Sequence, residues 1–239
     1  MTRLTACPDA ESAAERAARE VVRQLEGIRA QGRTPHVALT GGDTPQRTYE
    51  LLAREPEHWR DVEVWFGDER CVPPDDEQSN YRMAALALLD PAGITPERVH
   101  RMEGELGPER GAQRYGQLLG ERLDGGPVPV LDLILLGIGP DGHVASLFPR
   151  APTLQAGEEA VCLPVHDSPK PPPRRITLSL AALRAARRCM LLATGASKAD
   201  AISAMLAEPT PSVPASLLLR ERLTVIVDDA AAPAGGGRR

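Results

Sequence analysis

The stretch Leu131–Pro149 constrains the fold most, because an apolar run in it is followed at once by a glycine-rich turn. The run Leu131–Leu136 contains one polar residue, Asp132, and is typical of a strand buried in a parallel sheet. The turn Gly137–His143 contains three glycines, which let the backbone bend sharply and approach a ligand. Because ligands of open α/β sheets bind beyond the carboxyl ends of the strands, we expect His143 to lie at a binding site.

A glycine-rich turn after a strand is often only a turn. A histidine inside it indicates chemistry, because imidazole is the side chain whose ordinary pKa suits proton transfer near neutral pH. The other histidines lie outside such turns and are interpreted as structural or surface residues: His36, His58, His100 and His166.

A second glycine-rich turn, Thr40–Thr44, separates the predicted strand His36–Leu39 from the predicted helix Gln46–Arg54. This order presents backbone N–H groups and the positive end of a helix to an anion, so it predicts a phosphate site. It is also compatible with an ordinary helix start, in which Thr44 is the N-cap and Pro45 the first helical residue. The turn lacks the G-K-[ST] of a P-loop and does not indicate ATP chemistry.

Three charged residues follow the next predicted strand, Val62–Phe66, at its carboxyl end: Asp68, Glu69 and Arg70. Charged loop residues are usually solvated. Because this strand should lie in the same sheet, we expect all three side chains to face the same cleft as His143.

A further strand, Cys189–Ala193, leads through a turn into the predicted helix Ala199–Leu206. Lys198 stands at the start of this helix, where the helix dipole disfavours a cation, so its presence indicates a nearby anion. Lys198 and Lys170 are the only two lysines among 28 lysine and arginine residues. Since arginine serves as the general cation of this chain, a retained lysine is consistent with a need for its compact ammonium.

The remaining predicted elements continue the alternation of helices and strands. The helices are Asp9–Ala30, Ser79–Leu89 and Pro108–Leu123, and the strands are Ala160–Val165, Arg174–Leu178 and Leu223–Val227. The candidate linkers, Gly125–Pro129 and Ser168–Pro173, are each about six residues long, which suits loops rather than a domain junction. We therefore expect one α/β domain over residues 1–239, with a disordered Gly/Ala/Pro tail at Ala231–Arg239.

Composition excludes several classes of protein. A hydrophobic content of 42% supports a core, and a net charge of -5 argues against nucleic acid and anionic membranes as partners. The four cysteines are far apart and form no C-x-x-C pair, which argues against a zinc site and a disulfide framework. The start lacks a signal peptide and no apolar run is long enough to span a membrane, so we expect a cytoplasmic protein.

Six segments in this order resemble the 6-phosphogluconolactonases, from about residue 36 to residue 228. They are TGGDTP (Thr40–Pro45), WFGDER (Trp65–Arg70), SNYRMA (Ser79–Ala84), GIGPDGHVASLFP (Gly137–Pro149), PRRITL (Pro173–Leu178) and GASKADAI (Gly195–Ile202). The resemblance implies a Rossmann-like α/β fold, related to the glucosamine-6-phosphate deaminases, with a mostly parallel sheet flanked by helices on both faces. It also implies hydrolysis of 6-phosphogluconolactone to 6-phosphogluconate without a metal or organic cofactor. The sequence does not give the oligomeric state, and we expect a monomer or small homo-oligomer.

The resemblance also implies site residues. His143 corresponds to the general base, with Asp68 and Arg70 in the site. Substrate and phosphate contacts are expected from Thr40, Gly41, Gly42, Thr44, Gly139, Gly142, Arg175 and Lys198. Asp43 departs from the pattern, because many relatives carry an uncharged or basic residue there. A carboxylate would repel a phosphate, so we expect Asp43 to point away and cap the helix.

Hydrolysis of a δ-lactone needs an activated water, a proton for the ring oxygen and stabilisation of the oxyanion. Neutral His143 can take the proton of the water and return it to the ring oxygen. Either Asp68 or Asp141 can orient the imidazole. Arg70 and the backbone N–H groups of the turn Gly139–His143 are the candidate oxyanion donors.

Three alternatives remain at this point. A covalent route would use Ser146 or Cys71, but G-x-S-x-G is absent. A deaminase-isomerase would carry Asn-Glu-Pro soon after its Gly-His, where this chain has Ala145–Pro149 without an acid. A non-catalytic sugar-phosphate sensor would need a DNA-reading or partner-binding segment, and the chain has no basic arm.

Overall fold

The computed structural model describes residues 2–124 and 126–233. Its main sheet has six strands, all paired in parallel, in the spatial order β1-β9-β8-β5-β2-β3. The strands are β1 Arg3–Cys7, β2 His36–Leu39, β3 Glu63–Phe66, β5 Leu133–Leu136, β8 Arg188–Ala193 and β9 Leu223–Asp228. All four residues of β5 are buried between β2 and β8, which confirms the central buried strand predicted from the apolar run.

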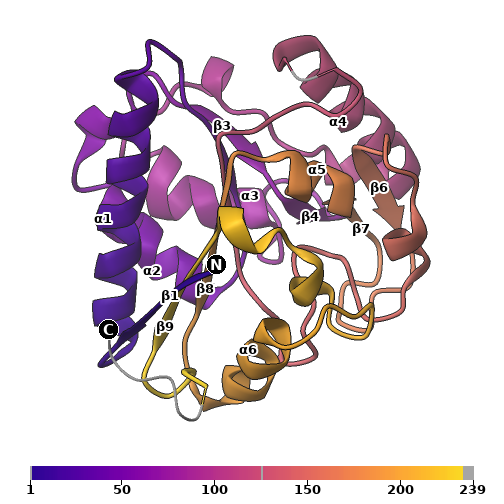
Figure 1. Cartoon of the computed structure of the whole chain (residues 1–239). Helices are drawn as coiled ribbons and strands as arrows, with labels where there is room; N and C mark the ends of the chain where they lie inside the picture. The colour runs from indigo at the N-terminus through magenta and orange to yellow at the C-terminus, as the bar shows by residue number, and fades with distance from the viewer. Residues whose placement is uncertain (1, 125, 234–239) are drawn as a thin grey trace.

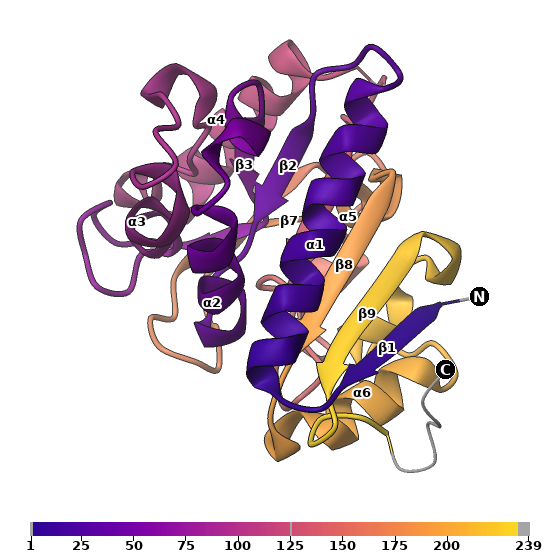
Figure 2. The ribbon, with the colours of Figure 1, turned by 90° about the vertical axis from the view of Figure 1, so that its left-hand side faces the viewer.

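Helices cover both faces of this sheet, as Figures 1 and 2 show, and confirm the predicted Rossmann-like arrangement. Helices α1 (Ala10–Arg29) and α2 (Asp43–Leu52) pack together on one face. Helices α5 (Leu180–Ala185) and α6 (Ala199–Leu206) lie on the other face. Helix α3 (Asn80–Ala84) continues as a wider turn to Leu89, so the predicted helix there is present but irregular.

A second, antiparallel sheet lies beside the main one and packs under α4 (Pro108–Arg122). Its order is β4-β7-β6, with β4 at Asp68–Arg70, β7 at Arg175–Leu178 and β6 at Cys162–Val165. The sequence predicted a loop at residues 68–70, whereas the chain leaves β3 at Gly67 and pairs with β7 instead. Three residues form too short a pattern to indicate a strand without knowledge of their partner.

The described residues near both ends of the chain are more ordered than the sequence indicated. Strand β1 was not predicted, because its alternation is weak, and it gains its structure by pairing with β9 at the sheet edge. The prediction of a disordered tail from residue 231 is wrong for the first residue of that tail. Ala231 is fully buried and donates from its backbone to the Asp228 carboxylate. Residues 234–239 lie outside the described part of the chain.

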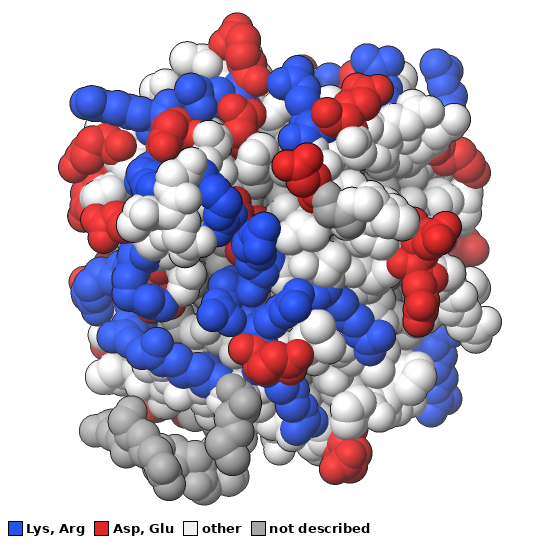
Figure 3. Space-filling model, turned by 45° about the horizontal axis from the view of Figure 1, so that its top comes forward, with Lys and Arg blue, Asp and Glu red and all other residues white. Residues whose placement is uncertain are grey.

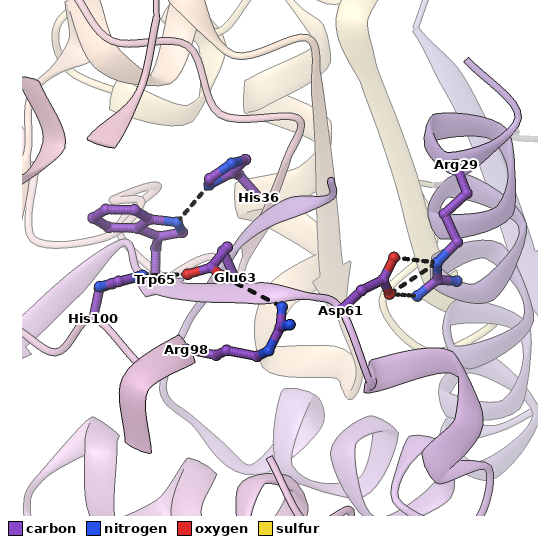
Figure 4. Close-up of polar contacts among 7 residues, drawn as sticks. All are labelled: Arg29, His36, Asp61, Glu63, Trp65, Arg98 and His100. Atoms are coloured by element: carbon purple, nitrogen blue, oxygen red, sulfur yellow. Dashed lines mark hydrogen bonds and ion pairs between the residues drawn. The ribbon is translucent and has the colours of Figure 1, made fainter. Parts of the chain in front are cut away.

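Two of the histidines interpreted as structural lie at the amino ends of β2 and β3, opposite the carboxyl ends (Figure 4). His36 Nδ1 accepts a hydrogen bond from Trp65 Nε1 at 3.2 Å, and burial lowers the pKa of His36. His100 stacks on Trp65 with ring centroids 4.1 Å apart and contacts Glu63 Oε2 through its Nε2 at 2.6 Å. The two imidazole rings therefore pack at the amino ends of β2 and β3 and contact side chains of β3.

Lysine and arginine side chains, which share one colour, form a band across the face in Figure 3, where the top of Figure 1 comes forward. Arginines at the start of β8 and just before β9 donate hydrogen bonds to backbone carbonyl groups. Arg222 Nη1 lies 3.2 Å from the carbonyl oxygens of Arg184 and Ala186, and Arg188 Nη1 lies 3.5 Å from that of Glu221. Within residues 2–124 and 126–233, no helix is long and apolar enough to cross a membrane.

Candidate active site

A cleft opens at the carboxyl ends of four neighbouring strands, β3, β2, β5 and β8. The chain runs outward from β2 to β3 in one direction and from β5 through β8 to β9 in the other. The order of strands therefore reverses between β2 and β5, and ligands of open α/β sheets bind at such a reversal. The cleft has a volume of about 510 Å³, which is sufficient for a sugar phosphate.

Most of the predicted site residues line this cleft. They are Thr40, Gly41, Gly42, Thr44, Asp68, Arg70, Gly139, His143, Arg175 and Lys198. Two do not line it. Asp141 reaches the cleft only through its bond to His143, and Gly142 is buried against Val213 with φ at +82°. The fold thus brings together four turns that are far apart in sequence.

His143 is held by a carboxylate two residues before it. Its Nδ1 donates to Asp141 Oδ1 at 2.5 Å. A carboxylate ion can only accept, so the shared proton belongs to Nδ1 and Nε2 keeps its lone pair. The ring also packs on Phe148, with centroids 4.6 Å apart. Two contacts therefore orient the imidazole at the cleft wall.

Burial is the main influence on the pKa of His143, and it lowers that pKa from its ordinary value of 6.5. The hydrogen bond and charge of Asp141 oppose the shift, while the charge of Lys170 adds to it. Burial, the largest single influence on Asp141, would raise its pKa, but the hydrogen bonds to His143 and the charges of His143 and Lys170 together outweigh burial, and the pKa of Asp141 is lowered. At neutral pH the pair is a neutral imidazole bonded to an ionised carboxylate.

Gly139 leaves the space that this pair occupies. A Cβ added there would overlap His143 Nδ1 and Cε1 and Asp141 Oδ1. We expect Gly139→Ala to displace the imidazole and lower kcat by about tenfold, because misplacing a reacting group raises the barrier. Steady-state kinetics will measure this. Gly137→Ala is the matched control, since its added Cβ meets no atom within 4 Å. Equal activity of the two variants would show that the close packing of His143 over Gly139 is unimportant.

Asp68 lies in the cleft but binds other groups. Its Oδ2 accepts from Ser146 Oγ at 2.6 Å, and its Oδ1 accepts from Asn80 Nδ2 at 3.2 Å. Its side chain is only 4% exposed. Its charge still acts on His143, whose pKa it raises slightly. Of the two carboxylates considered as partners of the imidazole, Asp141 makes the hydrogen bond and Asp68 does not.

Glu69 does not face the cleft, so that part of the prediction for residues 68–70 is wrong. Its carboxylate accepts from the backbone N–H groups of Arg70, Asn80 and Tyr81, at the start of α3. Successive side chains of a strand point to opposite faces, and residues 68–70 form strand β4. Asp68 and Arg70 therefore share the cleft side while Glu69 holds α3.

Few donors remain for an oxyanion. Three N–H groups of the turn after β5 make hydrogen bonds within that turn: those of Gly139, Gly142 and His143. Pro140 has no N–H. Arg70 donates through Nη1 to Gln78 O at 2.5 Å and is one of the residues that line the cleft. Arg70 is thus a better candidate than the turn.

The turn after β2 differs from the prediction. Helix α2 begins at Asp43, and the N-cap position is Gly42 with φ at +108°, so neither Thr44 nor Asp43 is a side-chain cap. Asp43 lines the cleft, contrary to the expectation that it points away. Thr44 Oγ1 instead lies 2.9 Å from Thr194 Oγ1. Because a carboxylate stands at this turn, attraction for a phosphate has to come from the cations that face it.

Lys198 is one of these cations. It immediately precedes α6, and its Nζ donates to Ile138 O at 2.8 Å, which leaves two of its three protons for a ligand. Burial lowers the pKa of Lys198, and the charge of Lys170 lowers it further, against the opposing charges of Asp141 and Asp43. A partly buried ammonium beside another cation is consistent with a bound anion.

Arg175 lies at the cleft but uses most of its donors within the protein. Its Nε donates to Pro172 O at 3.1 Å, and its Nη2 donates to Lys170 O at 3.0 Å and Pro171 O at 3.3 Å. Its Nη1 is 3.4 Å from Ser146 Oγ. Little of the guanidinium is therefore free for a substrate.

The two nucleophiles considered for a covalent route are poorly suited. Ser146 is fully buried and bonded to Asp68. Burial raises the pKa of the Cys71 thiol to about 11, which keeps it protonated at neutral pH. Across the described residues, no group of three or more His, Cys, Asp or Glu side chains could hold a metal ion.

Residues that sequence reasoning did not assign also line the cleft: Asn80, Lys170, Thr194 and Ser197. Asn80 packs over Gly41, where an added Cβ would overlap its Oδ1. The rarity of lysine was a signal for Lys170. Asn80 lies in the segment SNYRMA that resembles the family, but its place in the cleft depends on its hydrogen bonds to Asp68 of β4.

Comparisons with known proteins place this chain in a family. The family model described as glucosamine-6-phosphate isomerases/6-phosphogluconolactonase matches residues 8–227. The 6-phosphogluconolactonase of Streptomyces coelicolor is 40% identical over 210 residues, which cover 83% of this chain and 80% of that protein. The Mycobacterium leprae 6-phosphogluconolactonase is 39% identical over 211 residues, or 84% of this chain and 85% of that protein.

Superposition on solved structures also supports this fold. The 6-phosphogluconolactonase of Trypanosoma cruzi superposes with a TM-score of 0.86 at 28% identity, covering 99% of this chain and 98% of its own. A monomeric glucosamine-6-phosphate deaminase superposes with a TM-score of 0.80 at 22% identity, covering 96% and 98%, and so shares the fold. By the family match and the identity to its relatives, this chain belongs to the glucosamine-6-phosphate isomerase/6-phosphogluconolactonase family.

Proposed function

We propose that the protein hydrolyses 6-phospho-D-glucono-1,5-lactone to 6-phospho-D-gluconate, with His143 as general base. The proposal rests mainly on the neutral imidazole of His143, which lines the cleft with its Nδ1–H bonded to Asp141. The names of the relatives, which are 6-phosphogluconolactonases at 39–40% identity, support the choice of substrate.

His143 and Arg70 carry the proton transfers and the charge stabilisation that the reaction needs. Nε2 of His143 takes a proton from water as the water oxygen attacks the lactone carbonyl carbon. Arg70 stabilises the oxyanion that forms. The bond from that carbon to the ring oxygen then breaks, and the ring oxygen takes the proton from Nε2. The imidazole returns to its neutral form, and the new carboxylic acid loses its proton to solvent.

Asp141 supports both proton transfers. It holds the imidazole in the tautomer that accepts through Nε2, and its charge stabilises the imidazolium between the steps. Burial keeps the pKa of His143 low enough for the ring to start neutral. The His143–Asp141 pair therefore needs no other side chain to give a proton to the ring oxygen.

Deamination of an amino-sugar phosphate is the second candidate, because the deaminases share the fold. The residues after His143 disfavour it. Ser146 is the polar side chain of the segment Ala145–Pro149. It is fully buried and donates a hydrogen bond to Asp68. No carboxylate from this segment can reach the cleft to open a pyranose ring.

The direct test is a stopped assay of 6-phosphogluconate formed from fresh lactone, corrected for spontaneous hydrolysis. We expect enzyme-dependent formation that persists in EDTA, because the proposed steps use protein side chains alone. Ammonia release from glucosamine 6-phosphate, with no effect on the lactone, would favour the deaminase. Activity that is lost in EDTA and restored by zinc or magnesium would contradict the metal-free mechanism.

A further inference from the structure

A second pocket lies at the opposite end of the main sheet from the cleft, where β2, β5 and β8 begin. In Figure 2 this end is at the top, because the arrows of β8 and β9 point downward. The pocket has a volume of about 210 Å³. Its charged and titratable lining residues are Arg33, His36, Arg122, Asp124, Asp132 and Arg187. The proposed reaction uses none of them.

A buried carboxylate fixes two of the arginines in this pocket. Asp132 is only 4% exposed, and its Oδ1 accepts from Arg33 Nη1 and lies 3.2 Å from Arg187 Nε. Its Oδ2 accepts from the backbone N–H of His36 at 3.1 Å. These bonds satisfy the carboxylate, and within the described part of the chain both Nη groups of Arg187 are left without a partner. Asp132 therefore orients guanidinium groups that still have N–H donors to offer.

Two further donors of the pocket are unengaged. Arg122 is the last residue of α4, its side chain is exposed, and among residues 2–124 and 126–233 it forms no hydrogen bond or ion pair. His36 Nδ1 accepts from Trp65 Nε1, so the proton of the neutral imidazole is on Nε2, which has no partner among the same residues. Donors from the end of α4, the start of β2 and the start of β8 thus meet at one pocket without an acceptor.

The charges at this end of the sheet favour an anion. Three arginines line the pocket against Asp132, which is turned inward, and Asp124, which is exposed on the loop after α4. The basic band of Figure 3 lies at this end. In it, Arg188 and Arg222 donate to backbone carbonyl groups and keep their charges uncompensated. The surplus is therefore positive although the whole chain carries a net charge of -5.

We propose that this pocket is a second anion site, which binds a phosphoryl group between Arg122 and Arg187 with His36 as a further donor. The site is separate from the cleft, where the phosphate contacts of the substrate are expected. Guanidinium groups match the oxygens of phosphate with pairs of N–H bonds. A tetrahedral phosphate directs oxygens toward donors on several sides, whereas the two oxygens of a carboxylate lie in one plane. A bound phosphoryl group would therefore join the end of α4 to the starts of β2 and β8.

Titration with inorganic phosphate, followed by backbone amide NMR signals, tests the proposal without turnover. The signals of Leu123 and Asp132 report the pocket, and that of His143 reports the cleft, so the two ends of the sheet are followed in one sample. In wild type we expect the pocket signals to shift and saturate. In Arg122→Gln the midpoint of their titration should rise about tenfold, as for loss of one charge-assisted hydrogen bond, while that of His143 stays. Pocket signals that do not respond to phosphate, or equal midpoints in both proteins, would overturn the proposal.

Arg110→Gln is the matched control. Arg110 is another exposed arginine of α4 without a partner among the described residues, and it lies outside the pocket. Its substitution removes the same charge, so we expect the midpoint of the pocket signals to stay as in wild type. A rise equal to that of Arg122→Gln would show that net charge, rather than a contact of Arg122, sets the affinity, and would overturn the site.

A change of opposite sign comes from Asp124→Asn. The Asp124 carboxylate lines the pocket and repels an anion there, so its removal should lower the midpoint for phosphate. A higher midpoint in Asp124→Asn would contradict the proposal. Thermal unfolding without phosphate will show that each variant is folded, and Arg122→Gln should unfold near the wild-type temperature, because Arg122 makes no internal hydrogen bond or ion pair in the described part of the chain.

Other anions identify the ligand. Acetate at the same ionic strength should shift the pocket signals far less than phosphate, and equal midpoints would overturn the assignment to a tetrahedral anion. Glycerol phosphate distinguishes the two sources of a phosphoryl group: a midpoint below that of inorganic phosphate supports an ester as the ligand, and one above it supports the free ion. Hydrolysis of the lactone by Arg122→Gln should equal that of wild type, because the pocket lies at the other end of the sheet. A lower rate would show that the substitution acts on the cleft and that the two sites are not separate.

Discussion

Replacing His143 by alanine is expected to lower kcat by about 10²–10⁴-fold, the range typical of a lost general acid-base. The imidazole is the group in the cleft that can both take a proton from water and return it to the ring oxygen. The partly buried ring packs mainly on Phe148 and Asp141, so the fold should survive its loss. Initial rates on fresh 6-phosphogluconolactone will measure the effect, with circular dichroism to confirm folding.

His166→Ala is the control for this variant, because His166 is half exposed and pairs with Glu109 outside the cleft. It should retain wild-type rates. A folded His143→Ala enzyme with nearly wild-type activity would exclude His143 as the base.

The pH profile gives the same test a second readout. The pKa of His143 is lowered by burial, so the ring is neutral above that pKa and protonated below it. Only the neutral ring can accept a proton. kcat/KM should therefore be constant near neutral pH and fall on the acid side of the ordinary histidine pKa of 6.5. A flat profile from about pH 5 to 8, after correction for spontaneous opening, would contradict the assigned role.

Lys198→Ala is expected to lower kcat/KM on 6-phosphogluconolactone by roughly 10–150-fold, mainly by raising KM. This range corresponds to loss of a charge-assisted hydrogen bond of about 1.5–3 kcal/mol. The phosphate lies far from the reacting carbon, so contacts with it anchor the substrate more than they stabilise the transition state. Unphosphorylated gluconolactone should be a poor substrate of wild type and nearly indifferent to the change.

The second lactone also controls for a local structural effect. Lys198 Nζ supports the carbonyl of Ile138, just before Gly139, and truncation could shift that turn. A shifted turn would misplace His143 and impair both substrates alike. A loss confined to the phosphorylated lactone therefore supports phosphate binding, and equal losses would assign Lys198 to the turn.

The alternation of strands, glycine turns and helices was sufficient to predict the fold class. The run Leu131–Leu136 could be placed in the sheet because a continuous apolar run needs burial on both sides. Short strands were either not predicted or predicted as loops. Strand β4 at Asp68–Arg70 exists through pairing with β7, more than 100 residues later, and nothing local to three charged residues indicates that partner.

The sequence by itself determined which turns share an edge of the sheet. Parallel strands end on the same side, so Thr40–Thr44, Asp68, His143 and Lys198 had to lie near one another. Only the tertiary structure decided how their side chains are paired. Asp141 rather than Asp68 binds His143, Ser146 binds Asp68 across 78 positions, and Arg175 turns its donors toward the loop of Lys170. Such pairings depend on side-chain directions to within about an ångström, which periodicity and spacing do not encode.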